Sequence, residues 1–145
     1  MFMGEYRHSI DAKGRLIMPA KLREQLGNTF VITRGLDGCL FVYTDEEWKI
    51  KEEKFREIPL TKKEARTFAR FFFAGAAQLE IDKQGRVLIP STLREHASLD
   101  KEVVLVGVLD RVEIWDKKRW EDTNTYSEDE MDEIAEKMAE LGIGI

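Results

Sequence analysis

Two short segments with the same arrangement of residues, Asp11–Arg15 and Asp82–Arg86, carry the side chains best suited to chemistry. Each reads Asp-x-x-Gly-Arg, which is typical of a tight turn, because the carboxylate accepts hydrogen bonds from the backbone ahead of it and glycine adopts a positive φ at little cost. We therefore interpret Asp11, Gly14, Asp82 and Gly85 as structural residues of two turns.

The arginines of these segments are different, because a turn does not require them. Arg15 and Arg86 either hold the turn closed by pairing with the aspartate, or project toward a phosphate backbone or a guanine edge. In the second role they would act in company with Lys13, Lys83 and Arg7. The residues alone leave the two roles open.

A further basic run lies in the middle of the chain, at Lys62, Lys63, Arg66 and Arg70. It either extends the basic surface or forms the solvated face of a helix. The adjoining Phe71–Phe73 run continues a helical apolar stripe, which favours a place in the core over a platform for stacking bases.

No arrangement of residues indicates catalysis. The sequence has no glycine-rich phosphate loop, and neither of its two histidines lies beside an obvious nucleophile. Two histidines and the single Cys39 are too few for a usual zinc site. We therefore expect no enzyme, no catalytic residue, no metal and no cofactor.

The charge of the chain is unevenly distributed. The total is −5, but residues 121–145 hold nine acids and one base, and the remaining 120 residues stand at +3. A local basic patch decides what docks, so the acidic total does not exclude a nucleic acid. The sequence has no apolar stretch of membrane-spanning length and no signal-peptide core, which predicts a cytoplasmic protein without a membrane partner.

The elements that position the two turns occur twice in the chain. Residues 10–24 and 81–95 are identical at eight of fifteen positions, at an offset of 71, and the similarity continues to Trp48 and Trp120 at an offset of 72. Each copy reads as a strand, the Asp-x-x-Gly-Arg turn, a second strand, a short helix after Pro19 or Pro90, and two more strands. Capping residues predict four further helices, beginning at Thr44, Thr61, Asp116 and Ser127.

These repeated segments, IDAKGRLIMPAKLRE and IDKQGRVLIPSTLRE, resemble the bacterial MraZ family of tandem SpoVT/AbrB-type modules, each marked by an Asp-x-x-x-Arg motif. The resemblance covers essentially the whole chain. It implies an α+β fold, mainly β, in which two swapped-hairpin modules form one pseudo-symmetric unit with flanking helices. The corresponding divisions are module 1 at 5–47, a helical connector at 48–75, module 2 at 76–119 and an acidic helix or tail at 120–145.

The resemblance also implies a function. Family members are ring-shaped homo-oligomers that bind double-stranded DNA at short direct repeats upstream of the division and cell-wall gene cluster, repress it, and associate with the nucleoid. By residue match, DNA contact falls to Arg15 first, with Lys13 and Arg7 nearby. The second copy lacks the Arg7-His8 pair, so whether Arg86 contacts DNA or only supports the fold stays open.

Two other classes of function compete with this one. AbrB-type folds also occur in antitoxins, and the acidic amphipathic segment 127–141 is suited to wrapping a protein partner. The duplicated module and the short tail argue against that interpretation. A small barrel enzyme is the third possibility, and it requires a buried titratable pair that the sequence does not display.

Overall fold

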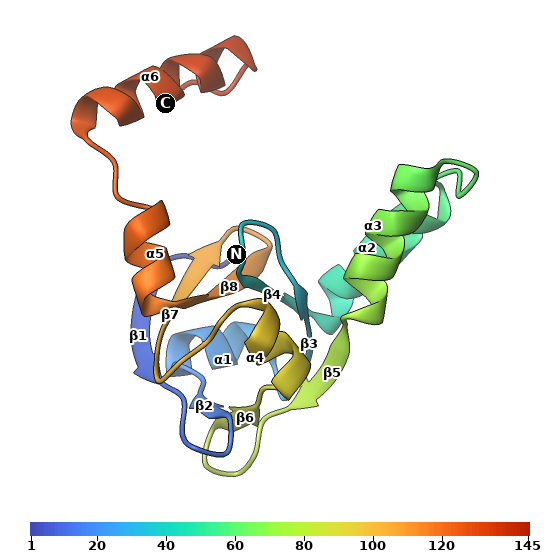
Figure 1. Cartoon of the computed structure of the whole chain (residues 1–145), viewed down its shortest axis with the longest axis vertical. Helices are drawn as coiled ribbons and strands as arrows, with labels where there is room; N and C mark the ends of the chain where they lie inside the picture. Colours follow the sequence, from blue (N-terminus) through green and yellow to red (C-terminus); the bar gives the residue numbers. More distant parts are fainter.

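The computed structural model describes residues 1–145, and the same succession of elements occurs twice along the chain (Figure 1). The first copy contains β1 (Glu5–Ser9), β2 (Arg15–Ile17), α1 (Ala20–Leu26), β3 (Thr29–Arg34) and β4 (Leu40–Thr44). The second contains β5 (Ala77–Glu80), β6 (Arg86–Leu88), α4 (Ser91–His96), β7 (Glu102–Val108) and β8 (Arg111–Asp116). The longer helices lie outside the copies: α2 (Asp45–Arg56), α3 (Lys63–Ala74), α5 (Lys117–Thr123) and α6 (Glu128–Glu140). The predicted α+β class is confirmed.

Side-chain caps explain where three of these outer helices begin. The side chains of Thr44, Asp116 and Ser127 each accept a hydrogen bond from the backbone N–H three residues ahead, as predicted. The predicted cap at Thr61 is wrong, because Lys62 takes the N-cap position of α3 and makes no capping hydrogen bond. A turn before the helix causes the shift, since the Lys62 N–H donates to the carbonyl of Pro59.

The strands of the two copies are exchanged within the sheets. Six of them form one sheet in the order β1-β7-β8-β4-β3-β5, and β2 pairs with β6 in a separate antiparallel ribbon. The first strand of each copy thus pairs with the third strand of the other copy, β1 with β7 and β5 with β3. Neither copy can complete its sheet alone.

A pseudo-twofold axis relates the copies, and it passes through two pairs of residues. Leu16 lies directly opposite Val87 in the β2/β6 ribbon, and Phe41 lies directly opposite Glu113 where β4 meets β8. Each pair joins residues at the same position of the two copies. The sequence repeat is therefore a symmetry of the structure.

Alternation along the strands separates two cores. On β4, Leu40 and Val42 face the larger core, whereas Phe41 and Tyr43 face an aromatic cluster on the other side of the sheet. The larger core also holds Leu16 and Val87 of the ribbon and the buried leucines of the two short helices, Leu22, Leu26 and Leu93. The ribbon is thereby fixed to the sheet by its inner face.

The aromatic cluster includes the phenylalanine run of α3. Phe72 is 4% exposed, and its ring stacks on those of Trp48 and Phe55 at centroid distances of 5.3 and 5.7 Å. Phe71 and Phe73 pack against the same cluster. The prediction that this run belongs to the core is confirmed.

Two helical arms extend from the body, the α2/α3 hairpin on one side and α5 with α6 on the other (Figure 1). Helix α6 has no buried residue. None of the six helices combines the length and hydropathy that a membrane span requires.

Candidate nucleic-acid interface

The first motif forms a turn that its aspartate holds from within. Asp11 Oδ1 accepts hydrogen bonds from the backbone N–H groups of Lys13 and Arg15, both at 2.9 Å. The Gly14 N–H donates to the carbonyl of Asp11 at 3.0 Å, and Gly14 adopts a φ of +86°. The other carboxylate oxygen, Asp11 Oδ2, accepts from Arg15 Nε at 2.7 Å.

The second motif repeats this geometry bond for bond. Asp82 Oδ1 accepts from the N–H groups of Gln84 and Arg86 at 2.9 Å, and Oδ2 accepts from Arg86 Nε at 2.9 Å. Gly85 adopts a φ of +77°. The replacement of Lys13 by Gln84 leaves the turn unchanged, because only the backbone N–H of that residue takes part.

The structure shows the first of the two roles considered for the arginines, the pairing with the aspartate, and this pairing leaves part of each guanidinium free. The aspartate engages Nε alone, so that the guanidinium of Arg15 or Arg86 is oriented while its two Nη groups make no hydrogen bond within the chain. The Arg15 and Arg86 side chains are 31% and 28% exposed. A guanidinium held at Nε and free at Nη is prepared for a phosphate or a guanine edge.

The same hydrogen bonds keep both aspartates ionised. The backbone N–H of Arg15 holds the pKa of Asp11 below its ordinary value; desolvation opposes this effect, and the hydrogen bond from the Arg15 guanidinium adds to it. The N–H of Arg86 lowers the pKa of Asp82 in the same way. The carboxylate that orients each arginine is thus charged at neutral pH.

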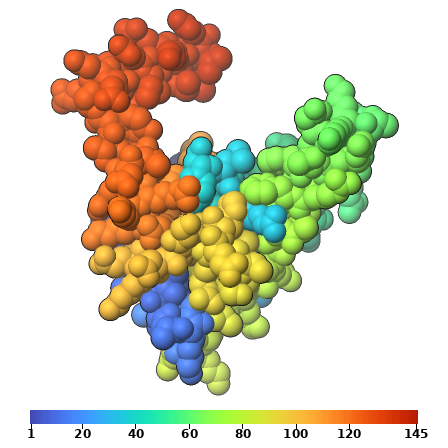
Figure 2. All heavy atoms as spheres, viewed as in Figure 1, coloured from blue at the N-terminus to red at the C-terminus, as the bar shows by residue number.

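The two turns lie at the ends of the β2/β6 ribbon, and each is clamped by the other copy. The Met18 N–H donates to the carbonyl of Gly85 at 2.9 Å, and the Ile89 N–H donates to that of Gly14 at 3.0 Å. Figure 2 shows both turns, in blue and yellow-green, at the lower end of the body, while α6 lies at the far end.

Two arginines that sequence reasoning did not single out also lie against these turns. Arg94 of α4 lies against Gly14, since a Cβ there would come within 2.7 Å of the Arg94 Cζ, and Arg23 of α1 lies against Gly85 in the same way. Each turn therefore carries its own arginine and one from the other copy. The signal was available, because both residues are among the identical positions of the repeat.

The predicted lysines also belong to the turns. Lys13 and Lys83 are exposed and make no ion pair. Segments 11–17 and 82–88 together hold four bases and two acids, and both acids are paired with arginine Nε. The arginine Nη groups and the two lysine ammonium groups therefore present unpaired, positively charged donors on this surface.

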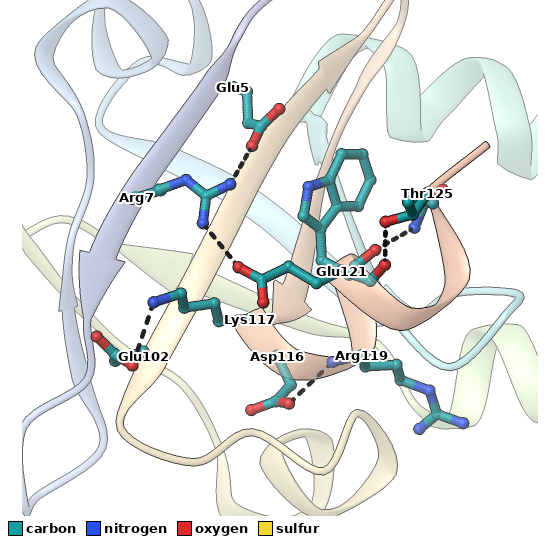
Figure 3. A network of polar contacts seen from close by, with 10 residues as sticks. Glu5, Arg7, Glu102, Asp116, Lys117, Arg119, Glu121 and Thr125 are labelled. Carbon is teal, nitrogen blue, oxygen red and sulfur yellow. Dashed lines mark hydrogen bonds and ion pairs between the residues drawn. The ribbon is translucent and has the colours of Figure 1, made fainter. Parts of the chain in front are cut away.

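Arg7 is engaged elsewhere. It lies on β1, where its guanidinium contacts Glu5 Oε1 at 2.9 Å and Glu121 Oε1 of α5 at 3.4 Å (Figure 3). Lys117 of α5 forms a neighbouring ion pair with Glu102 at 3.6 Å. The structure thus brings Arg15, Lys13, Arg86 and Lys83 into the two turns, and joins Arg7 to the start of the acidic C-terminal part.

The most buried reactive groups of the chain have structural environments. Cys39 is fully buried, and burial raises the pKa of its thiol far above the ordinary value, which keeps it protonated. Glu113 accepts hydrogen bonds from Arg111 and from Trp115 Nε1, the latter at 3.0 Å. No cluster of three or more His, Cys, Asp or Glu residues is placed to hold a metal ion.

Known proteins resemble this chain over its whole length. The model of the family described as "MraZ protein, putative antitoxin-like" matches twice, over residues 1–71 and 72–141. A protein named "Transcriptional regulator MraZ" from Ligilactobacillus salivarius (strain UCC118) is 60% identical over 143 residues, which cover 99% of this chain and 100% of that protein. Proteins of the same name from Heliobacterium modesticaldum and Acetivibrio thermocellus are 57% and 59% identical, with the same coverage.

Proposed function

The chain belongs to the MraZ family, and from this premise we propose that it is a sequence-specific DNA-binding transcriptional regulator. It acts as a ring-shaped homo-oligomer that recognises short direct repeats upstream of its own operon and represses the division and cell-wall gene cluster. A protein with this role works in the cytoplasm, at the nucleoid. All three relatives described above, each covered in full, carry the name of a transcriptional regulator.

The observation that carries the proposal is the paired turn. Two guanidinium groups, Arg15 and Arg86, are each fixed at Nε and free at Nη, and exposed lysines accompany them. Fixed, unpaired donors with positive charge suit a polyanion, because they lose little conformational entropy when phosphate binds. An enzyme active site would need a pocket with reactive groups, whereas these donors lie on an open surface.

Helix α6 supports the oligomeric part of the proposal. Its apolar stripe faces solvent, with Met131 and Ile134 at 44% and 36% exposure and the C-cap residue Leu141 at 72%, and acids occupy most of the other positions of the helix. An amphipathic helix with an uncovered apolar side needs a partner surface. A second copy of the chain can supply one along α3, where Phe68 is 36% exposed beside Lys63.

A ring makes a modest interface effective. One chain offers few cations, whereas several chains held in one assembly raise the effective concentration of every later contact. Repeats spaced about one helical turn, roughly 10 base pairs, present the same groove face to successive subunits. A straight duplex cannot follow a closed ring, so we expect the DNA to bend or the ring to distort.

Binding to the chain's own upstream region tests the proposal. Wild type and Arg15→Ala are titrated against this duplex at several salt concentrations, with a duplex whose repeats are scrambled as the control. We expect repeat-dependent binding that weakens steeply with salt, and a loss of roughly tenfold or more in the variant. Equal and weak binding to both duplexes would contradict the proposal.

The alternative function is that of a protein-interaction module of the antitoxin kind. The description of the matching family and the exposed amphipathic helix α6 favour it. A pull-down from a lysate distinguishes the two functions. One stoichiometric protein partner without retained DNA would support the antitoxin-like module, and retained operator DNA with copies of the same chain would support the regulator.

A further inference from the structure

The outer face of the β2/β6 ribbon exposes two aliphatic side chains that belong to neither hydrophobic core. Ile17 is 51% exposed and Leu88 is 55% exposed, whereas the adjacent Leu16 and Val87 are buried. Single exposed aliphatic residues are common on protein surfaces. This pair is different, because its members occupy the same position in the two copies of the repeat and share one face of one ribbon.

The strand register places the pair among cations. Leu88 lies opposite Arg15, and Ile17 lies opposite Arg86. The four side chains therefore form a checkerboard, in which each aliphatic residue has an arginine across the ribbon and another along its own strand. Directly opposite residues have Cβ atoms about 5 Å apart, so the aliphatic and cationic groups contact a partner together.

Charge decides which partner fits this surface. The ribbon and its turns carry four bases, and their only acids are the two aspartates paired with arginine. A face on which aliphatic side chains alternate with guanidinium groups that have free Nη donors matches the major groove of DNA, where phosphates form the rims and base edges form the floor. The groove is wide enough to admit a two-stranded ribbon, and among the four bases thymine alone presents a methyl group there.

We propose that Ile17 and Leu88 contact thymine C5-methyl groups in the major groove and so contribute base specificity at A·T pairs. This inference rests on the proposed DNA-binding function and adds base recognition to it. The arginines supply the electrostatic contacts, while Ile17 and Leu88 make apolar contacts with thymine methyl groups. Apolar contact with the thymine methyl is an established way of distinguishing this base.

The experiment removes the methyl groups from the DNA. The upstream duplex is prepared once with thymidine and once with deoxyuridine, which keeps the base pairing and the phosphate charge. The full-length wild type, the double variant Ile17→Ser/Leu88→Ser and the control Leu36→Ser are titrated against both. Leu36 is 52% exposed in the turn between β3 and β4, which lies at the other end of the body from the ribbon (Figure 1).

We expect the affinities for the two duplexes to differ, and we expect this difference to require Ile17 and Leu88. Wild type and Leu36→Ser bind the thymidine duplex more tightly, by roughly fourfold for each methyl contact, since burying one such group contributes about that factor. Ile17→Ser/Leu88→Ser binds both duplexes alike. Thermal unfolding and mass in solution, measured for all three proteins, show that the substitutions leave the fold and the assembly intact.

Two outcomes would overturn the inference. Wild type binding both duplexes equally would show that no methyl group is read, and a double variant that keeps the full difference would show that other residues read it. A double variant that loses its oligomeric mass but keeps the difference would assign the pair to contacts between copies. The proposed function fails separately, if wild type does not distinguish the upstream duplex from its scrambled control.

Discussion

The guanidinium of Arg94 lies against Gly14, although the two residues belong to different copies of the repeat. The Nε of Arg94 donates to the carbonyl of Ile89 at 3.0 Å, which fixes the Arg94 side chain over the turn of the first copy. Arg23 and Gly85 form the equivalent contact. Each candidate DNA-binding turn is therefore a product of both copies, and an isolated module would hold neither turn complete.

Substituting Gly14 tests this cross-copy contact. Gly14→Ala should lower the free energy of unfolding by about 1–2 kcal/mol, because the residue has a positive φ, and it should also displace Arg94 and weaken DNA binding. Gly27→Ala is a matched control, since Gly27 also has a positive φ of 83° but no atom lies near its added Cβ. Thermal unfolding and DNA titration of both variants check the prediction. Equal losses of DNA affinity would show that strain alone is responsible.

The two turns should contribute equally to DNA binding. Their hydrogen bonds correspond one for one, so Arg86→Ala should reduce affinity by the same factor as Arg15→Ala, roughly tenfold or more for each. Titrations at several salt concentrations measure both the loss and the change in salt dependence. A large loss for Arg15→Ala alone would assign Arg86 to the support of the fold.

Arg7 should matter much less than Arg15. Its guanidinium is paired with Glu5 and Glu121, so Arg7→Gln should change DNA affinity by less than roughly threefold and stability by less than about 0.5 kcal/mol, as for other exposed ion pairs. Glu121→Gln is the complementary variant, because it releases one bond of Arg7 without removing the cation. A loss for Arg7→Gln as large as that for Arg15→Ala would place Arg7 in the interface.

Acid should loosen both turns. The pKa values of Asp11 and Asp82 are lowered in the folded chain, so their contribution to stability is fully present above about pH 4 and is lost as the pH falls through the lowered values. Urea unfolding from pH 7 down to about pH 2.5 should therefore show a smaller decline for Asp11→Asn/Asp82→Asn than for wild type. If the free energy of unfolding declines equally in the variant and in wild type, other carboxylates govern the loss of stability in acid.

Removing α6 should separate assembly from folding. Helix α6 has no buried residue, so a chain ending at residue 126 should unfold at nearly the wild-type temperature while its mass in solution falls. Weaker binding to the repeats would follow from the loss of multivalency. Light scattering and DNA titration provide the two readouts. Binding that instead becomes several-fold tighter would show that the acidic helix inhibits the interface.

Local residues predicted much of the candidate site. The Asp-x-x-Gly-Arg spacing indicated the turn, since an aspartate, a glycine and the backbone between them form its hydrogen bonds without help from distant residues. Caps at Thr44, Asp116 and Ser127 were predictable for the same reason. The cap at Thr61 was not, because the turn from Pro59 to Lys62 competes with it.

The sequence by itself determined that the chain consists of two equal units, because a repeat of fifteen residues with eight identities is visible without any structure. Only the tertiary structure decided which strands pair, that Arg94 covers Gly14, and that Arg7 contacts Glu121. The physical reason is that a strand has the same alternation whether it pairs within its own copy or with the other. Contacts between residues far apart in the chain depend on that choice of partner, which no local pattern records.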